Sequence, residues 1–281
     1  MKSRVITIGI GGGSSAGKTT LANLLGGVLP KCTVLQINFT RVQDYWSDPK
    51  DCVTHPVYNE PYLEDPPTAI DWPVFRTRVK TLKFMTECLD PNLRESDSDT
   101  SSCNGSASQS SNTSTDIFIK PSEDTVAKWR ERFHELDKDL RSQGIQIKWC
   151  IVEGWHLYYD PEIIDDLDIR FLIRCPSNIL RDRKSKRAYK QKDGTMRVDP
   201  PYYWEHFSYP AYIRSHSHLF RGDIDTSPLS SEGEAAGIIL LDGEGTQRNL
   251  SCSGLFEAAA ATILLEGQSI SETVRASEIV A

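Results

Sequence analysis

Residues 4–20 read Arg-Val-Ile-Thr-Ile-Gly-Ile-Gly-Gly-Gly-Ser-Ser-Ala-Gly-Lys-Thr-Thr. The stretch opens with a β-branched apolar run, which is typical of a buried strand, and residues 18–29 after the glycines predict a helix. A glycine-rich turn can serve only to pack a helix on a strand. The spacing Gly-x-x-x-x-Gly-Lys-Thr at residues 12–19, placed between strand and helix, indicates instead a loop that binds phosphates.

The residue types in this loop suit a chain of phosphates. Gly12, Gly13 and Gly17 allow the dihedrals that turn several backbone N–H groups inward at once, and the following helix adds the positive end of its dipole. Lys18 can reach the β- and γ-phosphates, and the Thr19 hydroxyl can bind Mg²⁺. We therefore expect ATP and Mg²⁺ as cofactors.

The composition limits the kind of partner and compartment. A net charge of -7 over 281 residues argues against nucleic acid or a membrane surface as the main partner. The cysteines number seven and never form a Cys-x-x-Cys pair, so reduced thiols in the cytoplasm, or also the nucleus, fit best. No apolar run is long enough to span a bilayer. Small molecules are the expected ligands, and the oligomeric state is left open.

Further apolar runs, separated by helical patterns, predict the fold class. Four more strands are expected at residues 32–37, 145–152, 169–174 and 238–241, and amphipathic or basic helices at residues 71–89, 124–141 and 177–189. Together these elements predict a three-layer α/β/α sandwich with a five-stranded parallel sheet.

Two polar segments stand apart from this pattern. Residues from about 94 to 116 are rich in Ser, Asp, Asn and Thr with almost no apolar residue, so we expect a disordered insert. After Leu265 the chain becomes polar, and residues 266–281 are expected to form a flexible tail. The remainder, residues 1–265, is predicted to be one domain.

Glu153 ends the apolar run at residues 149–152 and precedes a glycine. In a parallel sheet this strand end lies at the same edge as the phosphate loop, where ligands bind. A carboxylate there can hold Mg²⁺ or accept a proton from a substrate hydroxyl. The alternative is a solvated glutamate at a strand end.

A cluster of five cations between residues 181 and 187 stands out in an otherwise acidic chain. On a continuous helix, Arg183 and Arg187 share one face. Such a helix can form a lid that neutralises a transferring phosphoryl group, and the alternative is a solvated charged face.

Several longer stretches resemble the eukaryotic nicotinamide riboside kinases, which are P-loop nucleoside kinases similar to uridine kinases. The similarity rests on G-I-G-G-G-S-S-A-G-K-T-T-L-A at residues 9–22, I-V-E-G-W-H-L-Y-Y at 151–159, R-K-S-K-R-A-Y at 183–189, V-D-P-P-Y-Y-W at 198–204 and L-L-D-G at 240–243. The phosphate loop alone names a superfamily, and the basic segment followed by V-D-P-P-Y-Y is more specific. The resemblance implies the P-loop kinase fold.

The same resemblance implies roles for individual residues. For ATP and Mg²⁺ it implies Gly12, Gly13, Ser14, Ser15, Ala16, Gly17, Lys18, Thr19 and Thr20, with Arg183 and Arg187 near the nucleotide phosphates. Glu153 is implied near magnesium, Asp65 as acceptor for ribose hydroxyls, and Tyr189 near the nicotinamide ring. Lys184 stands where the family has a hydroxyl-binding arginine, so the charge is kept and the planar fork is lost.

One departure from the family follows the second predicted strand. The family carries paired aspartates there, the first of which is implied as the base, and direct alignment places Ile37 and Asn38 at these positions. Neither side chain can accept a proton. A short insertion would place Asp44 in that role, so the catalytic group is expected to be Asp44 or Glu153, together with Lys18.

The resemblance implies phosphorylation of the ribose 5'-hydroxyl of nicotinamide riboside in NAD biosynthesis, with nicotinate riboside as a further candidate acceptor. Two alternatives remain open: a uridine or other nucleoside kinase, and a catalytically silent ATP-binding relative that has lost its base.

Overall fold

The computed structural model describes residues 1–36, 47–88, 120–190 and 196–280. Two predictions lie outside these residues: the shifted base Asp44 and the polar insert at 94–116. Everything below concerns the described part of the chain.

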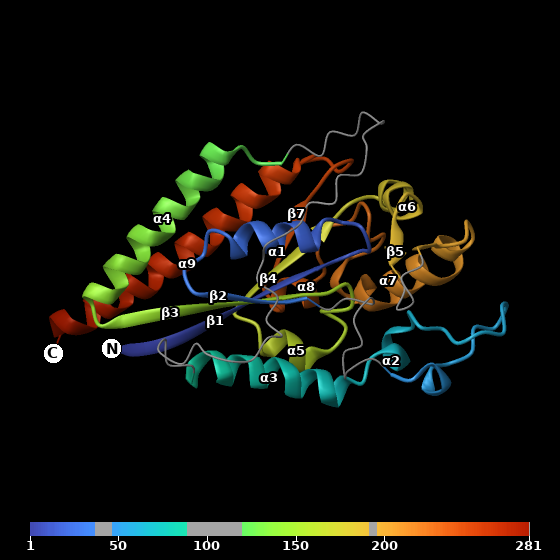
Figure 1. The fold of residues 1–281 in the computed structure, drawn as a ribbon, viewed down its shortest axis with the longest axis horizontal. Helices are drawn as coiled ribbons and strands as arrows, with labels where there is room; N and C mark the ends of the chain where they lie inside the picture. The colour runs from blue at the N-terminus through green and yellow to red at the C-terminus, as the bar shows by residue number, and fades with distance from the viewer. Residues whose placement is uncertain (37–46, 89–119, 191–195, 281) are drawn as a thin grey trace.

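Five parallel strands form the central sheet, in the order β2-β3-β1-β4-β7 (Figure 1). The strands are β1 (Lys2–Gly12), β2 (Cys32–Gln36), β3 (Ile145–Glu153), β4 (Ile169–Arg174) and β7 (Ile238–Asp242). Ile10 in β1 and Gln36 in β2 both lie opposite Glu153 in β3. This register confirms the predicted five-stranded parallel sheet and brings the end of β3 beside the start of the phosphate loop.

Helices cover both faces of this sheet. One layer contains α1 (Lys18–Gly26), α4 (Glu123–Ser142) and α9 (Cys252–Val280), and the other contains α3 (Trp72–Cys88) and α5 (Pro161–Asp165). The shorter helices are α2 (Pro66–Ala69), α6 (Ser177–Ser185), α7 (Tyr209–His216) and α8 (Ser231–Ala235), with single turns at Pro49–Asp51, Trp204–Ser208 and Ser217–Leu219.

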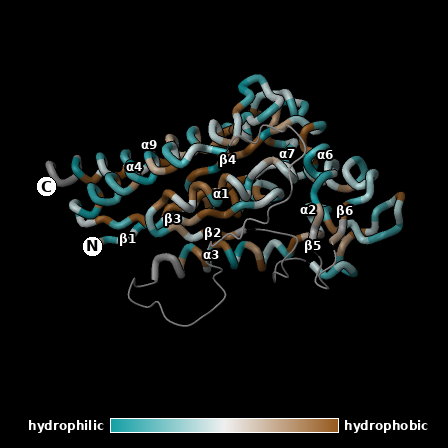
Figure 2. The backbone as a smooth tube through the Cα atoms, turned by 45° about the horizontal axis from the view of Figure 1, so that its top comes forward, coloured by the Kyte–Doolittle hydropathy of each residue, from teal (hydrophilic) through white to brown (hydrophobic). Residues whose placement is uncertain are grey.

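Each face of the sheet has its own apolar core, because parallel strands covered on both sides bury alternate side chains in opposite directions. Ile6, Ile8 and Ile10 of β1 pack toward α1, α4 and α9. Val152 and Leu172 face the other way, toward Phe75 and the rest of α3. In Figure 2 the helices α4 and α9 alternate between hydrophilic and hydrophobic colours, as expected for helices with one buried face.

The last helix, α9, continues past Leu265, after which the sequence predicted a flexible tail. Ile270 and Ser271 in this part are buried, and the Ser271 hydroxyl donates a hydrogen bond of 2.8 Å to Asp139 of α4. Among the described helices, none is long and apolar enough to cross a membrane.

The predicted basic helix at residues 177–189 is wrong at its carboxyl end. α6 ends at Ser185, and residues 188–190 form β5 (Ala188–Lys190), which pairs antiparallel with β6 (Met196–Val198). Arg183 and Arg187 therefore do not share a helix face. Lysine and arginine favour a helix locally, but pairing with a strand further along the chain overrides that preference.

Candidate active site

The phosphate loop leaves β1 in a conformation that requires glycine. Gly12 has a φ of 138°, and a Cβ there would lie 2.5 Å from the carbonyl oxygen of Ile173. Gly17 caps the start of α1 with a φ of 100°. Residues other than glycine rarely adopt these backbone dihedrals, so the two glycines let the loop turn directly into the helix.

Polar groups in the loop fit a bound phosphate chain. The Lys18 ammonium is buried and donates a 2.8 Å hydrogen bond to the carbonyl oxygen of Gly13. Burial lowers the pKa of Lys18 to about 8, although the nearby Glu153 carboxylate raises it. The Ser15 hydroxyl is buried with no hydrogen-bond partner among the described residues. A triphosphate would supply the acceptors that these donors lack.

Thr19 and Glu153 meet at the end of the sheet, as the sequence predicted. The Thr19 hydroxyl donates a hydrogen bond of 2.7 Å to the Glu153 carboxylate, which is 2% exposed. Burial raises the pKa of Glu153, partly offset by the positive charge of Lys18. Mg²⁺ prefers oxygen ligands and accepts one or two carboxylates beside phosphate. The two side chains therefore fit a magnesium ion next to the phosphate loop.

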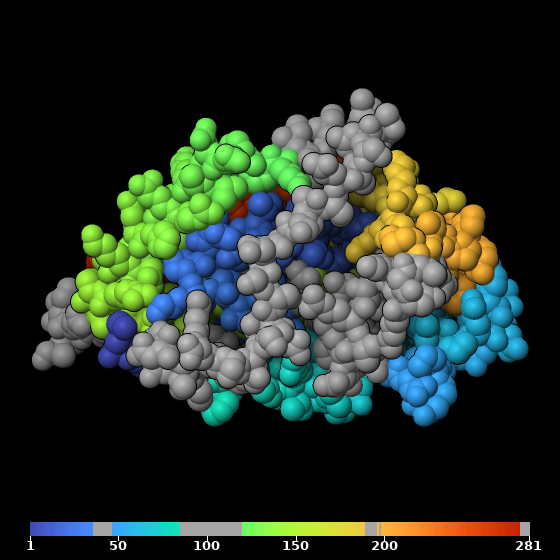
Figure 3. Space-filling model, viewed as in Figure 1, coloured from blue at the N-terminus to red at the C-terminus, as the bar shows by residue number. Residues whose placement is uncertain are grey.

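Arg183 lies beside the same loop. Its guanidinium forms an ion pair of 2.5 Å with Glu244 and donates to the carbonyl oxygen of Ser15 at 3.4 Å. Arg183 and Glu244 border an open pocket of about 400 Å³. The rest of its lining is mostly small or apolar and includes Ala16, Gly17, Leu21, Cys175, Leu250, Cys252 and Leu255. In Figure 3 the N-terminal residues, in blue, lie between α4 in green and the yellow and orange segments around α6 and α7.

The residues predicted to bind the acceptor lie in different elements: Asp65 directly before α2, Lys184 in α6 and Tyr189 in β5. Asp65 precedes α2 and is 2% exposed; it accepts a 2.8 Å hydrogen bond from the Thr68 hydroxyl and forms an ion pair with Arg214. Lys184 of α6 is buried and lies 3.0 Å from Asp199. Tyr189 lies in β5, opposite Arg197 of β6. The Arg187 charge, like that of Lys184, is close enough to lower the pKa of Lys18.

Comparison with known proteins agrees with this geometry. No family model matches the chain. It is 25% identical to a nicotinamide riboside kinase of Saccharomyces cerevisiae over 79% of this chain and 82% of that protein. It is 28% identical to one of Eremothecium gossypii over 77% of this chain and 78% of that protein. A Schizosaccharomyces pombe nicotinamide riboside kinase is 35% identical over 26% of this chain and 32% of its own length.

The chain is therefore similar to nicotinamide riboside kinases over most of its length. The segment around Asp65 also holds a polar network that the sequence did not predict. The His156 ring, buried three residues after Glu153, contacts the Glu64 carbonyl oxygen through Nε2 at 3.0 Å and the Ser215 hydroxyl through Nδ1. Burial holds the pKa of His156 well below its usual range, so the ring is neutral. A carbonyl oxygen only accepts, so the His156 Nε2–H donates to Glu64, while the Ser215 hydroxyl donates a 2.9 Å hydrogen bond to the Ala211 carbonyl oxygen.

An aromatic cluster lies beside this polar network. Tyr62, Trp155 and Phe207 are buried together, and the Tyr62 hydroxyl donates a 2.6 Å hydrogen bond to the Phe207 carbonyl oxygen. Tyr203 stacks on Phe207 with ring centroids 4.8 Å apart, and the Lys184 ammonium lies 5.5 Å from the centre of the Tyr203 ring. These rings form an apolar surface beside the Lys184 ammonium.

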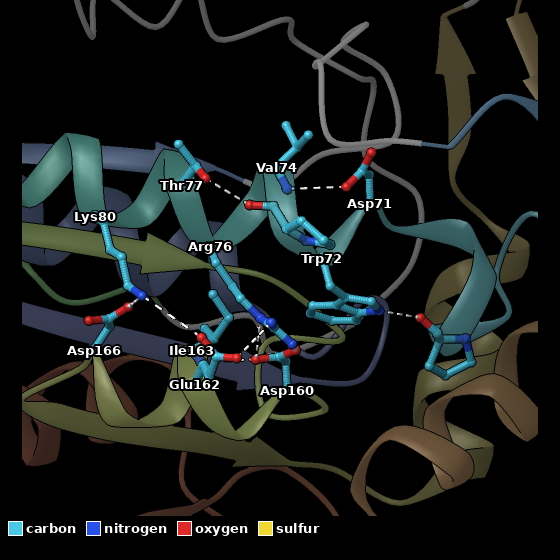
Figure 4. Close-up of polar contacts among 12 residues, drawn as sticks. Asp71, Trp72, Val74, Arg76, Thr77, Lys80, Asp160, Glu162, Ile163 and Asp166 are labelled. Carbon is cyan, nitrogen blue, oxygen red and sulfur yellow. Dashed lines mark hydrogen bonds and ion pairs between the residues drawn. The ribbon is translucent and has the colours of Figure 1, made fainter.

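The segment that carries Asp65 is anchored to the sheet by α3 and α5. Figure 4 shows the Trp72 indole donating a 3.0 Å hydrogen bond to the Pro66 carbonyl oxygen. The Arg76 guanidinium forms an ion pair with the buried Asp160, which also caps α5 by accepting from the Ile163 N–H at 3.2 Å. The start of α2 is therefore tied to the loop that follows Glu153.

Proposed function

We propose that this protein transfers the γ-phosphoryl group of ATP to the ribose 5'-hydroxyl of nicotinamide riboside, forming the mononucleotide in NAD biosynthesis. The observation that carries the proposal is the contact of Thr19 with the buried Glu153 beside Lys18. It occurs at the edge of the sheet in a chain whose relatives are nicotinamide riboside kinases. Nicotinate riboside is a further candidate acceptor.

The phosphate loop and its neighbours would hold the nucleotide. Lys18 would exchange its bond to the Gly13 carbonyl for the β- and γ-phosphates, and Arg183 and Arg187 would add positive charge. Thr19 and Glu153 would hold Mg²⁺, which supplies neutralisation of the charge that develops on the phosphates. The pocket beside Arg183 and Glu244 is placed to receive the base of ATP.

On the acceptor side, Asp65 and Lys184 would bind the ribose hydroxyls and Tyr189 would lie near the pyridine ring. Proton removal from the 5'-hydroxyl needs a carboxylate within hydrogen-bonding reach. Asp44 is the base we propose, and Glu153 is the alternative because burial raises its pKa and makes it a better proton acceptor.

The direct test is an ADP-release assay with Mg-ATP and four conditions: nicotinamide riboside, nicotinate riboside, uridine and no acceptor. We expect turnover with the pyridine ribosides, and loss of kcat in Asp44→Ala. Turnover with uridine alone would assign the protein to another class of nucleoside kinase. ATP binding without any product would indicate a silent relative. Retained turnover in Asp44→Ala would move the base to Glu153.

The organisation and location of the protein are also proposed here. Residues 1–265 would form one kinase domain, since both cores share one sheet. The described cysteines Cys52, Cys150, Cys175 and Cys252 are free thiols, which supports a reducing compartment, the cytoplasm or also the nucleus.

A further inference from the structure

The acceptor side carries an excess of buried negative charge. Three carboxylates converge there, Glu64, Asp65 and Asp199, and among the described residues two cations form ion pairs with them, Lys184 and Arg214. Glu64 and Asp65 are almost completely buried, while the Arg214 side chain is 48% exposed. Water screens an exposed cation more than a buried one. The cluster is therefore one positive charge short.

Glu64 is the least compensated of the three carboxylates. Its Oε1 lies 3.7 Å from the Lys184 ammonium, which lies closer, at 3.0 Å, to Asp199. Its buried Oε2 has no hydrogen bond of good geometry among the described residues, although the Ser208 hydroxyl lies close enough to lower the pKa of Glu64. Burial raises the pKa of Glu64. A buried carboxylate with an open oxygen is a group that a ligand can satisfy.

Glu64 lies among the residues proposed to bind the acceptor, because it directly precedes Asp65 and its carboxylate lies 3.7 Å from the Lys184 ammonium. Its backbone is held by His156, three residues beyond Glu153 on the same strand end. Its partner Lys184 follows Arg183, which touches the phosphate loop at Ser15. Lys18 and Arg187 lie on the side of the phosphate loop, and their positive charges suit the negatively charged ATP rather than the acceptor.

We propose that Glu64 makes the acceptor site selective for a positively charged nucleoside. This inference rests on the proposed function and deepens it. The pyridinium ring of nicotinamide riboside carries a permanent positive charge, whereas nicotinate riboside adds a carboxylate and has no net charge, and uridine is neutral. The excess negative charge attracts the first and gives no such advantage to the others. The protein therefore prefers nicotinamide riboside to nicotinate riboside.

Glu64→Gln tests this charge with almost no change in shape. We expect kcat/KM for nicotinamide riboside to fall about tenfold relative to that for nicotinate riboside, as the loss of one nearby charge predicts. The matched control is Glu162→Gln, which removes one negative charge from the surface of α5, where Glu162 pairs with Arg76. The control should leave the preference unchanged.

Two further measurements keep the inference separate from the proposed function. Calorimetric binding of both ribosides reports charge selection without turnover, so selective binding by an inactive protein would overturn the function alone. Dihydronicotinamide riboside keeps the carboxamide and ribose without the charge, and wild-type protein should bind it about tenfold more weakly than nicotinamide riboside. Equal binding of the charged and neutral ribosides, or a preference unchanged within about twofold in a folded Glu64→Gln variant, would overturn the inference.

Discussion

Glu153 combines a proposed catalytic role with a cost to the stability of the folded protein. Its carboxylate is buried beside Thr19 and Lys18, and burial raises its pKa. Because the pKa of Glu153 is higher in the folded protein than in the unfolded chain, folding disfavours the charged carboxylate. This cost to stability is present at neutral pH and disappears as the pH falls through the folded-state pKa. Removal of the charge should therefore stabilise the protein while it abolishes activity.

Glu153→Gln tests both effects. We expect kcat to fall at least about 100-fold, because the carboxylate next to the transferring phosphoryl is lost. The midpoint of thermal unfolding of the ligand-free protein should rise by about 2–4 °C at pH 7, and this gain should shrink toward pH 4.5. Calorimetry at several pH values measures it. A variant that is both active and less stable would show that the carboxylate is structural.

The lowered pKa of Lys18 predicts a loss of activity at high pH. Its pKa is lowered to about 8 by burial, so the ammonium loses its proton as the pH rises through this value, and with it the charge that attracts phosphates. We expect kcat/KM for ATP to fall above pH 8, since this parameter reports the free enzyme. Lys18→Met should bind ATP weakly at every pH. A flat profile for wild-type protein up to pH 9.5 would contradict the assignment.

The residues found from sequence and those missed differ in how local their signal is. Lys18 and Thr19 belong to a loop whose spacing is complete within eight residues, and Glu153 follows directly from the end of an apolar strand. His156 and Glu64 are neighbours only in space, because 92 positions separate the partners of their hydrogen bond. The sequence offered one hint, that Glu64 precedes Asp65. No spacing rule could have joined it to His156.

At the scale of elements, α3 holds the segment around Asp65 in place through the indole of Trp72. Trp72 is buried on the α3 face and donates to the Pro66 carbonyl oxygen directly after Asp65. Trp72→Phe keeps an aromatic ring and removes that bond, which should lower the free energy of unfolding by about 1–2 kcal/mol. Because α2 loses an anchor, KM for the nucleoside should rise several-fold while KM for ATP stays constant.

Trp129→Phe is a matched control for this prediction. Trp129 is buried in α4 on the opposite face of the sheet, so its substitution removes similar volume far from Asp65. It should lower stability without a change in either KM. Equal effects of the two variants on the nucleoside KM would indicate a general loss of packing in place of positioning.

The prediction of helices and strands was wrong where a strand forms only by pairing with another segment of the chain. Five strands were found because each is a short apolar run of β-branched residues, and the parallel order follows from the helices between them. The basic segment was predicted as helix to residue 189, yet α6 ends at Ser185. The strand at residues 188–190 exists only because it pairs with residues 196–198. The Asp-Gly at residues 193 and 194 was the available hairpin signal.

At the scale of the whole molecule, the apolar cores on the two faces of the sheet support different parts of the proposed active site. The face covered by α1, α4 and α9 supports the phosphate loop, whose helix α1 packs there. The face covered by α3 and α5 supports the segment around Asp65. The chain passes from the second face to the first between α3 and α4, and the polar insert at residues 94–116 lies in this connection. Nothing in its composition offers a contribution to either core.

This organisation predicts that the insert is dispensable for catalysis. Replacement of residues 94–116 by about ten Gly and Ser residues should keep kcat/KM within about twofold, because loop shortening changes closure entropy only slightly. The assay is ADP release with nicotinamide riboside, and thermal unfolding serves as the check on folding. A control with residues 94–116 shuffled in order separates length from sequence. If shortening lowers kcat with the unfolding midpoint unchanged while the shuffled chain stays active, the connection must have a minimum length for the site to assemble. If both variants lose activity while remaining folded, the insert supplies a residue to the active site.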